Sequence, residues 1–415
     1  MNAQAGRRGA DLVVGGRTLG IGPQWLARAW SGGWHRIMER IDAGLARGSI
    51  ELVLPDGSIC LLGGRSPGFE AKVRLHDARA LLRLATGGSV GWYQAWEAGE
   101  WDSPDPVPLF ALFMDNAAAL GDMGRAHGPW RWLARLLHWL NRNSRPGSLR
   151  NIHAHYDLGN DFYAAWLDPT MCYSSARFTE GITDLEAAQR HKMDMMAQRL
   201  EGARTLLEIG CGWGSLARHF ADRGVAVTAI SLSDEQLGWA RSRHDGAGIR
   251  FLKQDYRDIA EPFDAIASVE MVEAVGQAYW PDFFDCIARC LRRGGRAAIQ
   301  FIAMRDDLFD GYARSADFIQ TYIFPGGMLV RESAFRRLAA KRGLIWKDEA
   351  RFGLDYAETL RLWRGNFDRA VDEGRLPAGF DHRFVRLWRF YLMFCESGFR
   401  GRGIDVLQVT LEKHA

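Results

Sequence analysis

The chain has 415 residues, a formal net charge of +3 and 25% charged residues. This length favours two domains, and so small a net charge gives no reason to expect a nucleic-acid partner. The six cysteines include no C-x-x-C pair, which argues against a structural zinc site and favours a reducing compartment.

The first 125 residues predict a small α+β domain without a catalytic signature. The extreme N-terminus lacks the apolar segment of a signal peptide, and no apolar run reaches the ~18 residues of a membrane-spanning helix. The elements expected here are helices at 23–46, 77–85 and 109–120, and strands at 49–54, 58–62 and 71–75. We treat this domain as a candidate for lipid, membrane or dimer contacts.

Residues 126–150 predict a helix followed by a linker. Pro129–Leu140 places Trp132 and Leu133 on an apolar face flanked by arginines. Such a helix can lie on an anionic membrane or pack between domains, and the sequence leaves both options open. The polar, Pro- and Gly-containing stretch 141–148 marks the expected domain boundary, with the second domain at 151–415.

Strand and helix patterns alternate from about residue 200, which is typical of a doubly wound parallel α/β sheet. The strands are expected at 205–210, 226–231, 249–253, 265–269 and 297–302, with an added edge strand at 405–411. Two aromatic, arginine-rich helices at 355–371 and 381–397 interrupt the sheet. They are candidates for a lid over the substrate.

The stretch Thr205–Ala217 carries the first functional signal. An apolar strand containing Glu208 runs into a Gly-x-Gly-x-Gly turn and then into a helix. Glycines let the backbone take positive φ and approach a ligand closely, so a nucleoside is expected there. By itself this pattern also fits an ordinary strand–helix turn. The glycines are Gly210, Gly212 and Gly214.

The neighbouring strands favour S-adenosylmethionine over a nicotinamide dinucleotide. A dinucleotide enzyme normally ends its second strand with an acid, whereas this strand ends at Ser231. The acid comes after the third strand, at Asp255, followed by Tyr256. We expect Asp255 to hold the adenine amino group and Tyr256 to lie against the ring. Ser231 and Gln236 are expected to reach the ribose.

The sequence resembles the cyclopropane fatty acid synthases and mycolic acid methyltransferases from about His153 to the C-terminus. The motifs that carry the resemblance are His155–Tyr163, Met171–Ser175, Leu207–Gly214, Gln254–Asp258, Tyr322–Gly327 and Phe352–Tyr356. It implies a seven-stranded class I methyltransferase sheet with a helical lid, preceded by a smaller N-terminal domain like that of the long bacterial synthases. It also implies that Tyr173 and Ser174 touch the cofactor.

The resemblance implies transfer of a methyl group from S-adenosylmethionine to a cis double bond of a phospholipid acyl chain. A carbocation forms next to the new methyl group and must lose a proton, and in the family bicarbonate is the base. Its ligands match Glu273, Tyr356 and the backbone of Ile302, while Ser175 and Gln300 stand at the Cys and His positions. We expect an altered base site centred on Glu273 and Tyr356. The alternative is that Ser175 and Gln300 are packed polar residues and no anion binds.

Aromatic faces can stabilise a cation, and several aromatic residues are candidates for this or for the core. They are Tyr279, Trp280, Phe318, Tyr322 and Phe324. The product stays open between cyclopropane, methylene and methyl-branched chains. Two rival functions remain, a methyltransferase of a soluble small molecule and an inactive lipid-binding homologue. We expect a cytoplasmic protein, peripheral to the inner membrane, that forms a homodimer.

Overall fold

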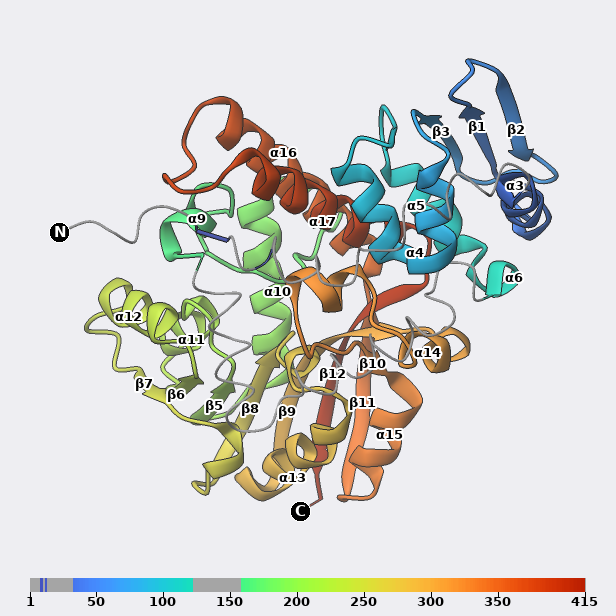
Figure 1. Ribbon diagram of the computed structural model, residues 1–415. Helices are drawn as coiled ribbons and strands as arrows, with labels where there is room; N and C mark the ends of the chain where they lie inside the picture. The colour runs from blue at the N-terminus through green and yellow to red at the C-terminus, as the bar shows by residue number, and fades with distance from the viewer. Residues whose placement is uncertain (1–7, 10–11, 13–32, 122–157, 415) are drawn as a thin grey trace. The chain divides into compact units, whose positions relative to one another are not determined.

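The computed structural model describes residues 8–9, 12, 33–121 and 158–414 (Figure 1). The chain divides into two compact units. Of the described residues, the first unit comprises 8–9, 12, 33–121, 305–325 and 378–404, and the second comprises 158–304, 326–377 and 405–414. The predicted helix at 129–140 and the linker at 141–148 lie outside the described residues.

The first unit contains a four-stranded sheet in the order β2-β1-β3-β4. Its strands are β1 (Ser49–Val53), β2 (Ile59–Gly63), β3 (Glu70–Leu75) and β4 (Trp101–Asp102). Alternate residues of β3 are buried, as expected when one face of a sheet packs on a core. The nearby helices are α3 (Gly33–Gly44), α4 (Arg79–Glu97), α5 (Val107–Asp115) and α6 (Ala117–Leu120). The strands predicted at 49–54, 58–62 and 71–75 are therefore confirmed.

The first unit also contains segments from far along the chain, which the sequence pattern did not indicate. They are α14 (Asp306–Tyr312), the π-helical turn η6 (Ile319–Ile323) and α17 (His382–Arg400). The buried ring of Tyr93 lies 4.9 Å from Phe318, 4.7 Å from Tyr322 and 5.1 Å from Phe390, measured between centroids. Residues from three distant stretches thus build one aromatic core.

The second unit is a doubly wound α/β sheet in the order β11-β12-β9-β8-β5-β6-β7, with β10 paired to β9 (Figure 1). The strands are β5 (Thr205–Ile209), β6 (Ala226–Ser231), β7 (Arg250–Lys253), β8 (Phe263–Val269), β9 (Leu291–Met304), β10 (Val330–Arg331), β11 (Leu344–Arg351) and β12 (Ile404–Lys413). The five strands from β5 to β9 pair in parallel, and β11 pairs antiparallel to β12. The predicted α/β sheet is confirmed.

One predicted position in this sheet is wrong. The strand expected at the edge, β12, lies between β11 and β9. The edge belongs to β11, whose residues are mostly exposed or half-buried and therefore give no apolar pattern in the sequence. Its solvated face explains why it was not predicted.

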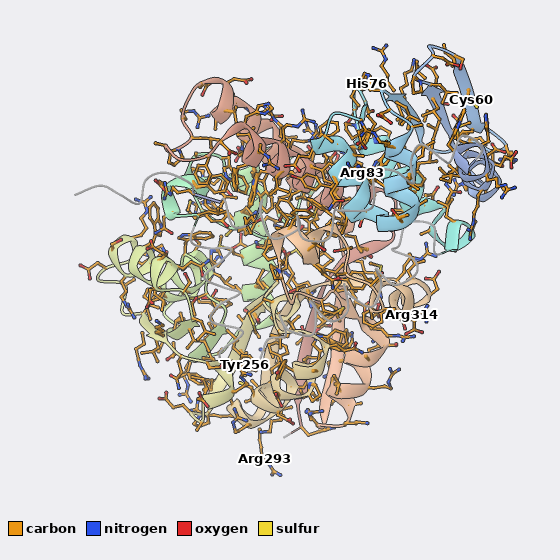
Figure 2. The ribbon with its side chains drawn as sticks, viewed as in Figure 1. Cys60, His76, Arg83, Tyr256, Arg293 and Arg314 are labelled. Carbon is orange, nitrogen blue, oxygen red and sulfur yellow. The ribbon has the colours of Figure 1, made fainter. Side chains whose placement is uncertain are left out.

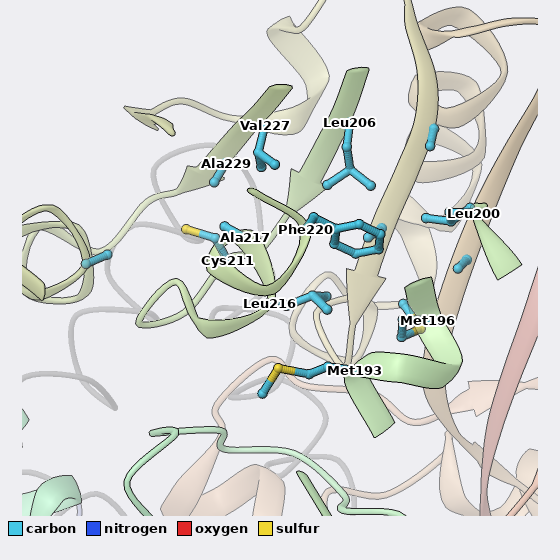
Figure 3. Packing of buried hydrophobic residues seen from close by; sticks show 14 of the residues in the cluster. Met193, Met196, Leu200, Leu206, Cys211, Leu216, Ala217, Phe220, Val227 and Ala229 are labelled. Atoms are coloured by element: carbon cyan, nitrogen blue, oxygen red, sulfur yellow. The ribbon is translucent and has the colours of Figure 1, made fainter. Parts of the chain in front are cut away.

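Both faces of the central strands are covered by helices. On one face, α10 (Leu185–Arg199), α11 (Ser215–Ala221) and α12 (Asp234–Arg243) pack against the strands. Figure 3 shows Met193, Met196 and Phe220 gathered beside Leu206 and Val227. On the other face lie α13 (Trp280–Cys290) and α15 (Glu332–Ala340), where Phe335 of α15 contacts both Phe284 of α13 and Phe301 of β9. Strands buried on both faces read as continuous apolar runs, which is why β5 was easy to predict.

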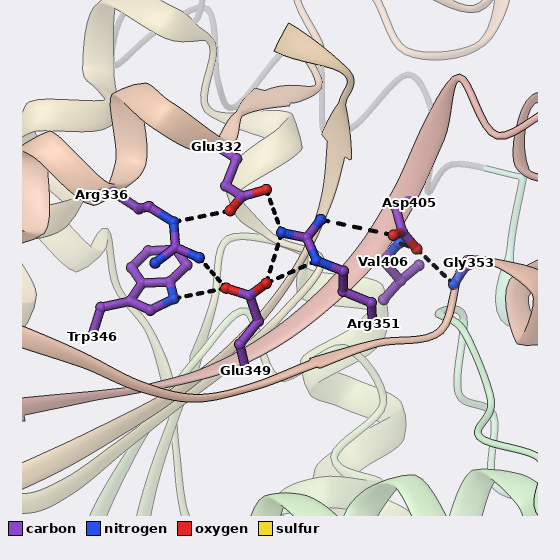
Figure 4. Close-up of polar contacts among 8 residues, drawn as sticks. All are labelled: Glu332, Arg336, Trp346, Glu349, Arg351, Gly353, Asp405 and Val406. Carbon is purple, nitrogen blue, oxygen red and sulfur yellow. Dashed lines mark hydrogen bonds and ion pairs between the residues drawn. The ribbon is translucent and has the colours of Figure 1, made fainter.

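An ion-pair network joins β11, α15 and the start of β12 (Figure 4). The Arg351 guanidinium lies 2.7 Å from the carboxylates of Glu332 and Glu349 and 3.8 Å from that of Asp405. Asp405 Oδ1 also accepts a 2.8 Å hydrogen bond from the backbone N–H of Gly353, the first residue of α16 (Gly353–Asp372). The network therefore fixes where α16 begins relative to the sheet.

None of the helices in residues 33–121 and 158–414 combines the length and the apolar character needed to cross a bilayer.

Candidate functional site

A cavity of about 190 Å³ lies in the second unit, where the carboxyl ends of β5, β6 and β8 meet. In doubly wound sheets this edge is the usual ligand-binding position. Nine of the ten predicted cofactor residues line the cavity, and the exception is Gly214. The nine are Tyr173, Ser174, Glu208, Gly210, Gly212, Ser231, Gln236, Asp255 and Tyr256.

The glycine turn after β5 gives the cavity its floor. Gly210 has φ +82°, and a Cβ atom there would stand 2.5 Å from the Cγ of Met271, so the position accepts no side chain. Gly212 has φ +51°, and a Cβ atom there would meet no protein atom within 4 Å. Gly214 instead precedes α11 and faces His244. The expected role of Gly214 in cofactor binding stays a prediction, since Gly214 does not line the cavity and instead forms the turn into the helix.

Glu208 is a buried carboxylate at the edge of this cavity, with 4% of its surface exposed. Burial raises the pKa of Glu208 to about 8, while the Lys192 ammonium and the Ala217 backbone N–H act in the opposite direction. Its Oε2 atom has no hydrogen-bond partner within the described residues. Lys192 Nζ donates to the Ser174 hydroxyl at 2.7 Å. An unpartnered buried carboxylate oxygen beside a cavity suits a ligand that brings hydrogen-bond donors or positive charge.

Polar groups line the cavity beyond the ends of β6 and β7. The Ser231 hydroxyl donates to Gln236 Oε1 at 3.2 Å. The Asp255 carboxylate accepts two hydrogen bonds from the Arg257 guanidinium, at 2.9 and 2.5 Å. A carboxylate paired in this way still has lone pairs for a further donor, such as an amino group of a base. Burial also raises the pKa of Tyr256, which Figure 2 labels.

Aromatic rings enclose the cavity from the side of α16. The Tyr173 ring lies 5.3 Å from Trp363 of α16 and 5.3 Å from Tyr163. The lining residue Trp213 lies 5.1 Å from Tyr163 and donates its Nε1–H to the Asn160 side chain at 2.7 Å. These rings present apolar, electron-rich faces, which exclude water and favour a cationic ligand.

Glu270 is the centre of a hydrogen-bonded cluster that the sequence pattern did not reveal. Its Oε1 atom accepts from the backbone N–H of Ser175 at 3.0 Å and from Gln300 Nε2 at 2.8 Å. Its Oε2 atom accepts from the Tyr356 hydroxyl at 2.8 Å. Burial raises the pKa of Glu270, while these three donors and Lys192 oppose the rise. Glu270 also lines the cavity, so the cluster opens onto the predicted cofactor site.

Glu273 occupies a different environment in the same cluster. Its Oε1 atom accepts from the Ile302 backbone N–H at 2.5 Å, and its Oε2 atom has no partner among the residues that the structure describes. Burial, followed by the charge of Glu270, raises the pKa of Glu273 to about 8. Gln300 also accepts from Gln408 Nε2 of β12 at 3.2 Å. Of the five residues of the predicted base site, Ser175, Gln300 and Tyr356 therefore bond to Glu270, while Ile302 bonds to Glu273.

The donors that the resemblance assigns to bicarbonate are already engaged within the protein. Tyr356 and Gln300 donate to Glu270, and the Ile302 N–H donates to Glu273. The Ser175 hydroxyl donates to the neighbouring backbone carbonyl at 2.8 Å. A bound anion would also face the Glu270 carboxylate, and two neighbouring negative charges oppose each other. The described residues do not fit a bound bicarbonate ion.

The five aromatic residues named as candidates for stabilising the cation do not line the cavity. Trp280 is buried and packs 5.2 Å from Phe335 in the core of the second unit. The Arg257 guanidinium lies over the Tyr279 ring at 5.6 Å. Phe318 and Tyr322 belong to the aromatic core of the first unit, and Phe324 lies 6.3 Å from Tyr391 there. The aromatic residues found at the cavity are others, namely Tyr173, Trp213 and Tyr256.

Comparisons with known proteins agree with this geometry. The family model described as mycolic acid cyclopropane synthetase matches residues 143–409. The tuberculostearic acid methyltransferase of Mycobacterium tuberculosis is 35% identical over 412 residues, which cover 93% of this chain and 92% of that protein. The cyclopropane-fatty-acyl-phospholipid synthase of Escherichia coli is 36% identical over 389 residues, which cover 92% and 94%.

Solved structures show the same fold. The cyclopropane synthase MmaA2 from Mycobacterium tuberculosis has a TM-score of 0.59 and 30% identity, covering 64% of this chain and 98% of that one. The mycolic acid cyclopropane synthase CmaA1, complexed with SAH and CTAB, has a TM-score of 0.60 and 29% identity with the same coverage. The sheet is thus the class I methyltransferase sheet expected from the sequence. The chain belongs to the mycolic acid cyclopropane synthetase family.

Proposed function

We propose that this protein transfers the methyl group of S-adenosylmethionine to a cis double bond in an unsaturated acyl chain of a phospholipid. Members of its family are S-adenosylmethionine-dependent methyltransferases that make cyclopropane or methyl-modified fatty acids. The relatives that match more than nine-tenths of this chain include a fatty-acyl-phospholipid synthase and a tuberculostearic acid methyltransferase. These names support an acyl-chain substrate.

The observation that carries the proposal is the cavity beside the glycine turn. Gly212 leaves room at the turn, and Glu208 presents an unpartnered buried carboxylate oxygen within the described residues. S-adenosylmethionine brings hydroxyl and ammonium groups, from which such a carboxylate can accept hydrogen bonds, and a sulfonium whose positive charge it attracts. The cavity residues therefore fit this cofactor. The complex of CmaA1 with SAH, the demethylated form, supports a cofactor of this kind.

Different residues of this chain would have different roles in the reaction. When bound, the cofactor supplies an electrophilic methyl group. The turn and Glu208 would orient it, while Tyr173 and Trp213 would keep water from the reacting atoms. The alkene donates its π electrons to the methyl carbon, and the neighbouring carbon becomes a cation. A carboxylate in the Glu270–Glu273 cluster would then accept a proton from the methylated chain.

The proposal includes the place where the enzyme acts. A phospholipid acyl chain lies in a bilayer, so the protein would work at a membrane surface, on the cytoplasmic side where S-adenosylmethionine is made. Loss of the proton from the new methyl group gives a cyclopropane, and loss from a chain carbon gives a methylene or methyl-branched alkene. The names of the relatives include a cyclopropane synthase and a tuberculostearic acid methyltransferase.

The test is incorporation of label from methyl-labelled S-adenosylmethionine into phospholipid vesicles. Vesicles with cis-unsaturated chains should gain label, and mass spectrometry should show one added CH₂ on the acyl chain. Vesicles with fully saturated chains are the matched control and should gain none. Label in neither preparation, with cofactor binding intact by calorimetry, would contradict the proposal and favour a soluble acceptor. Absence of cofactor binding would favour an inactive homologue.

A further inference from the structure

We propose that the Glu270 carboxylate is the proton acceptor of the reaction and replaces a bound bicarbonate ion. The inference rests on the proposed function, because it concerns the cation formed after methyl transfer. Glu270 accepts hydrogen bonds from Ser175, Gln300 and Tyr356, the groups that the resemblance assigns to the anion. A side-chain carboxylate thus takes the hydrogen-bonding position that a free anion would otherwise fill.

The position of Glu270 sets it apart from Glu273. Of the two carboxylates in the described cluster, Glu270 lines the cavity and Glu273 does not. Glu270 accepts three hydrogen bonds, whereas Glu273 accepts one from Ile302. Because donors favour the ionised form of an acid, the negative charge of the pair resides on Glu270. The charged member is therefore the one that faces the reacting chain.

The backbone of Glu270 is a second, independent observation. Glu270 has φ +48°, in the left-handed region that favours glycine. This conformation is strained in a residue other than glycine, and such strain persists where surrounding contacts hold it. The backbone N–H of Glu270 donates to the Gln300 carbonyl at 2.8 Å. The backbone and the side chain of Glu270 are thus both bonded to Gln300 of β9, at a position that lines the cavity.

The proposed step balances without another reactant. The methyl–sulfur bond breaks with its electrons left on sulfur, and the alkene electrons form the new carbon–carbon bond. Glu270 then takes a proton, and the electrons of the broken C–H bond close the ring or form a new double bond. Glu270 is left as a neutral carboxylic acid, which returns its proton to solvent after the product leaves.

The first test uses the unaltered full-length protein. Methyl transfer to unsaturated phospholipid vesicles is measured in buffers freed of carbon dioxide and again after bicarbonate is added. We expect the same turnover in both, because the base is part of the chain. A rise in turnover on adding bicarbonate would overturn the inference. If no methyl transfer occurs under either condition, the proposed function fails instead, so the two failures are distinguishable.

The second test is Glu270→Gln, which keeps the shape and removes the base. General-base groups contribute roughly 10²- to 10⁴-fold, so turnover should fall by that factor while S-adenosylmethionine affinity measured by calorimetry is retained. The matched control is Glu396→Gln, a buried glutamate of α17 bonded to Arg400, which should keep turnover unchanged. Full turnover by Glu270→Gln would overturn the inference.

The third test is chemical rescue of Glu270→Gly. Glycine suits φ +48° without strain and leaves space for a small carboxylate such as formate. Formate should restore part of the turnover of Glu270→Gly and none of that of Glu270→Gln, whose amide still fills the site. Asp348→Gly, at an exposed position with φ +49°, controls for the backbone change alone. Equal rescue of Glu270→Gln and Glu270→Gly would place the added anion elsewhere and overturn the inference.

Discussion

Replacing Glu208 by glutamine should stabilise the ligand-free protein while weakening its binding of S-adenosylmethionine. The carboxyl is buried, and its pKa rises from an ordinary 4.5 to about 8. A raised pKa means that the folded protein favours the protonated acid. The stability that protonated Glu208 contributes to the folded state is fully present below about pH 4.5. It is lost as the pH rises through about 8 and the buried carboxyl ionises. Glutamine imitates the protonated acid at every pH and removes this loss.

The size of the effect follows from proton linkage. The raised pKa of Glu208 lowers the free energy of unfolding by roughly 4 kcal/mol at about pH 7.5 and by roughly 1.5 kcal/mol at about pH 5.5. The stability gained by Glu208→Gln should therefore grow by roughly 2.5 kcal/mol between these two pH values. Unfolding by urea of the wild type and the variant, without ligand, measures this difference at each pH.

The same raised pKa also predicts an effect of pH on the binding of the cofactor. A cationic ligand beside Glu208 lowers its pKa, so binding near neutral pH should release a proton from the wild type. Calorimetry in buffers with different heats of ionisation detects that proton, and Glu208→Gln should release none from this position. A stability difference that is independent of pH would refute the reasoning, because it would mean that Glu208 titrates normally in the fold.

Three other substitutions test the site. Gly210→Ala brings a Cβ atom against Met271 at positive φ, so it should lower the free energy of unfolding by at least about 1 kcal/mol, measured by urea, and weaken cofactor binding. Gly212→Ala meets no protein atom and should weaken S-adenosylmethionine binding by calorimetry without a packing clash; unchanged affinity would mean that the ligand does not approach this turn. Tyr356→Phe removes a donor from the buried Glu270 carboxylate, so it should cost about 1–3 kcal/mol of stability and reduce turnover in the vesicle assay. Unaltered turnover of Tyr356→Phe would separate the hydroxyl from the chemistry.

The central sheet was predictable because its strands obey local rules. β5 and β6 are short, mostly apolar runs bounded by turns, and burial on both faces leaves few polar residues in them. β11 escapes such rules, since its stability comes from pairing with β12 and from the ion pairs of Arg351 rather than from an apolar stripe. β12 lies inside the sheet because β11 pairs with it on its outer side, and β11 was not predicted.

The candidate site also has one part that the sequence predicts and one part that it does not. The cofactor residues follow strand ends in fixed order, so sequence spacing was enough to place Glu208, Ser231 and Asp255 around one cavity. The hydrogen-bonded cluster proposed as the base instead depends on the position of one carboxylate, that of Glu270. Glu270 and Glu273 both follow β8, and the sequence gives no means to see that the first takes a left-handed backbone conformation and lines the cavity. The only available hint was an acid directly after the strand.

The shared aromatic core of the first unit limits how this gene can be shortened. Tyr93 packs against Phe318 and Phe390, and the chain leaves and re-enters each unit several times. A fragment that starts after residue 141 would keep the whole methyltransferase sheet and yet expose the rings of η6 and α17 to water. Such a fragment should be insoluble unless those rings are replaced by polar residues. A shorter enzyme of this kind could arise only if the later segments changed together with the loss of the N-terminal one.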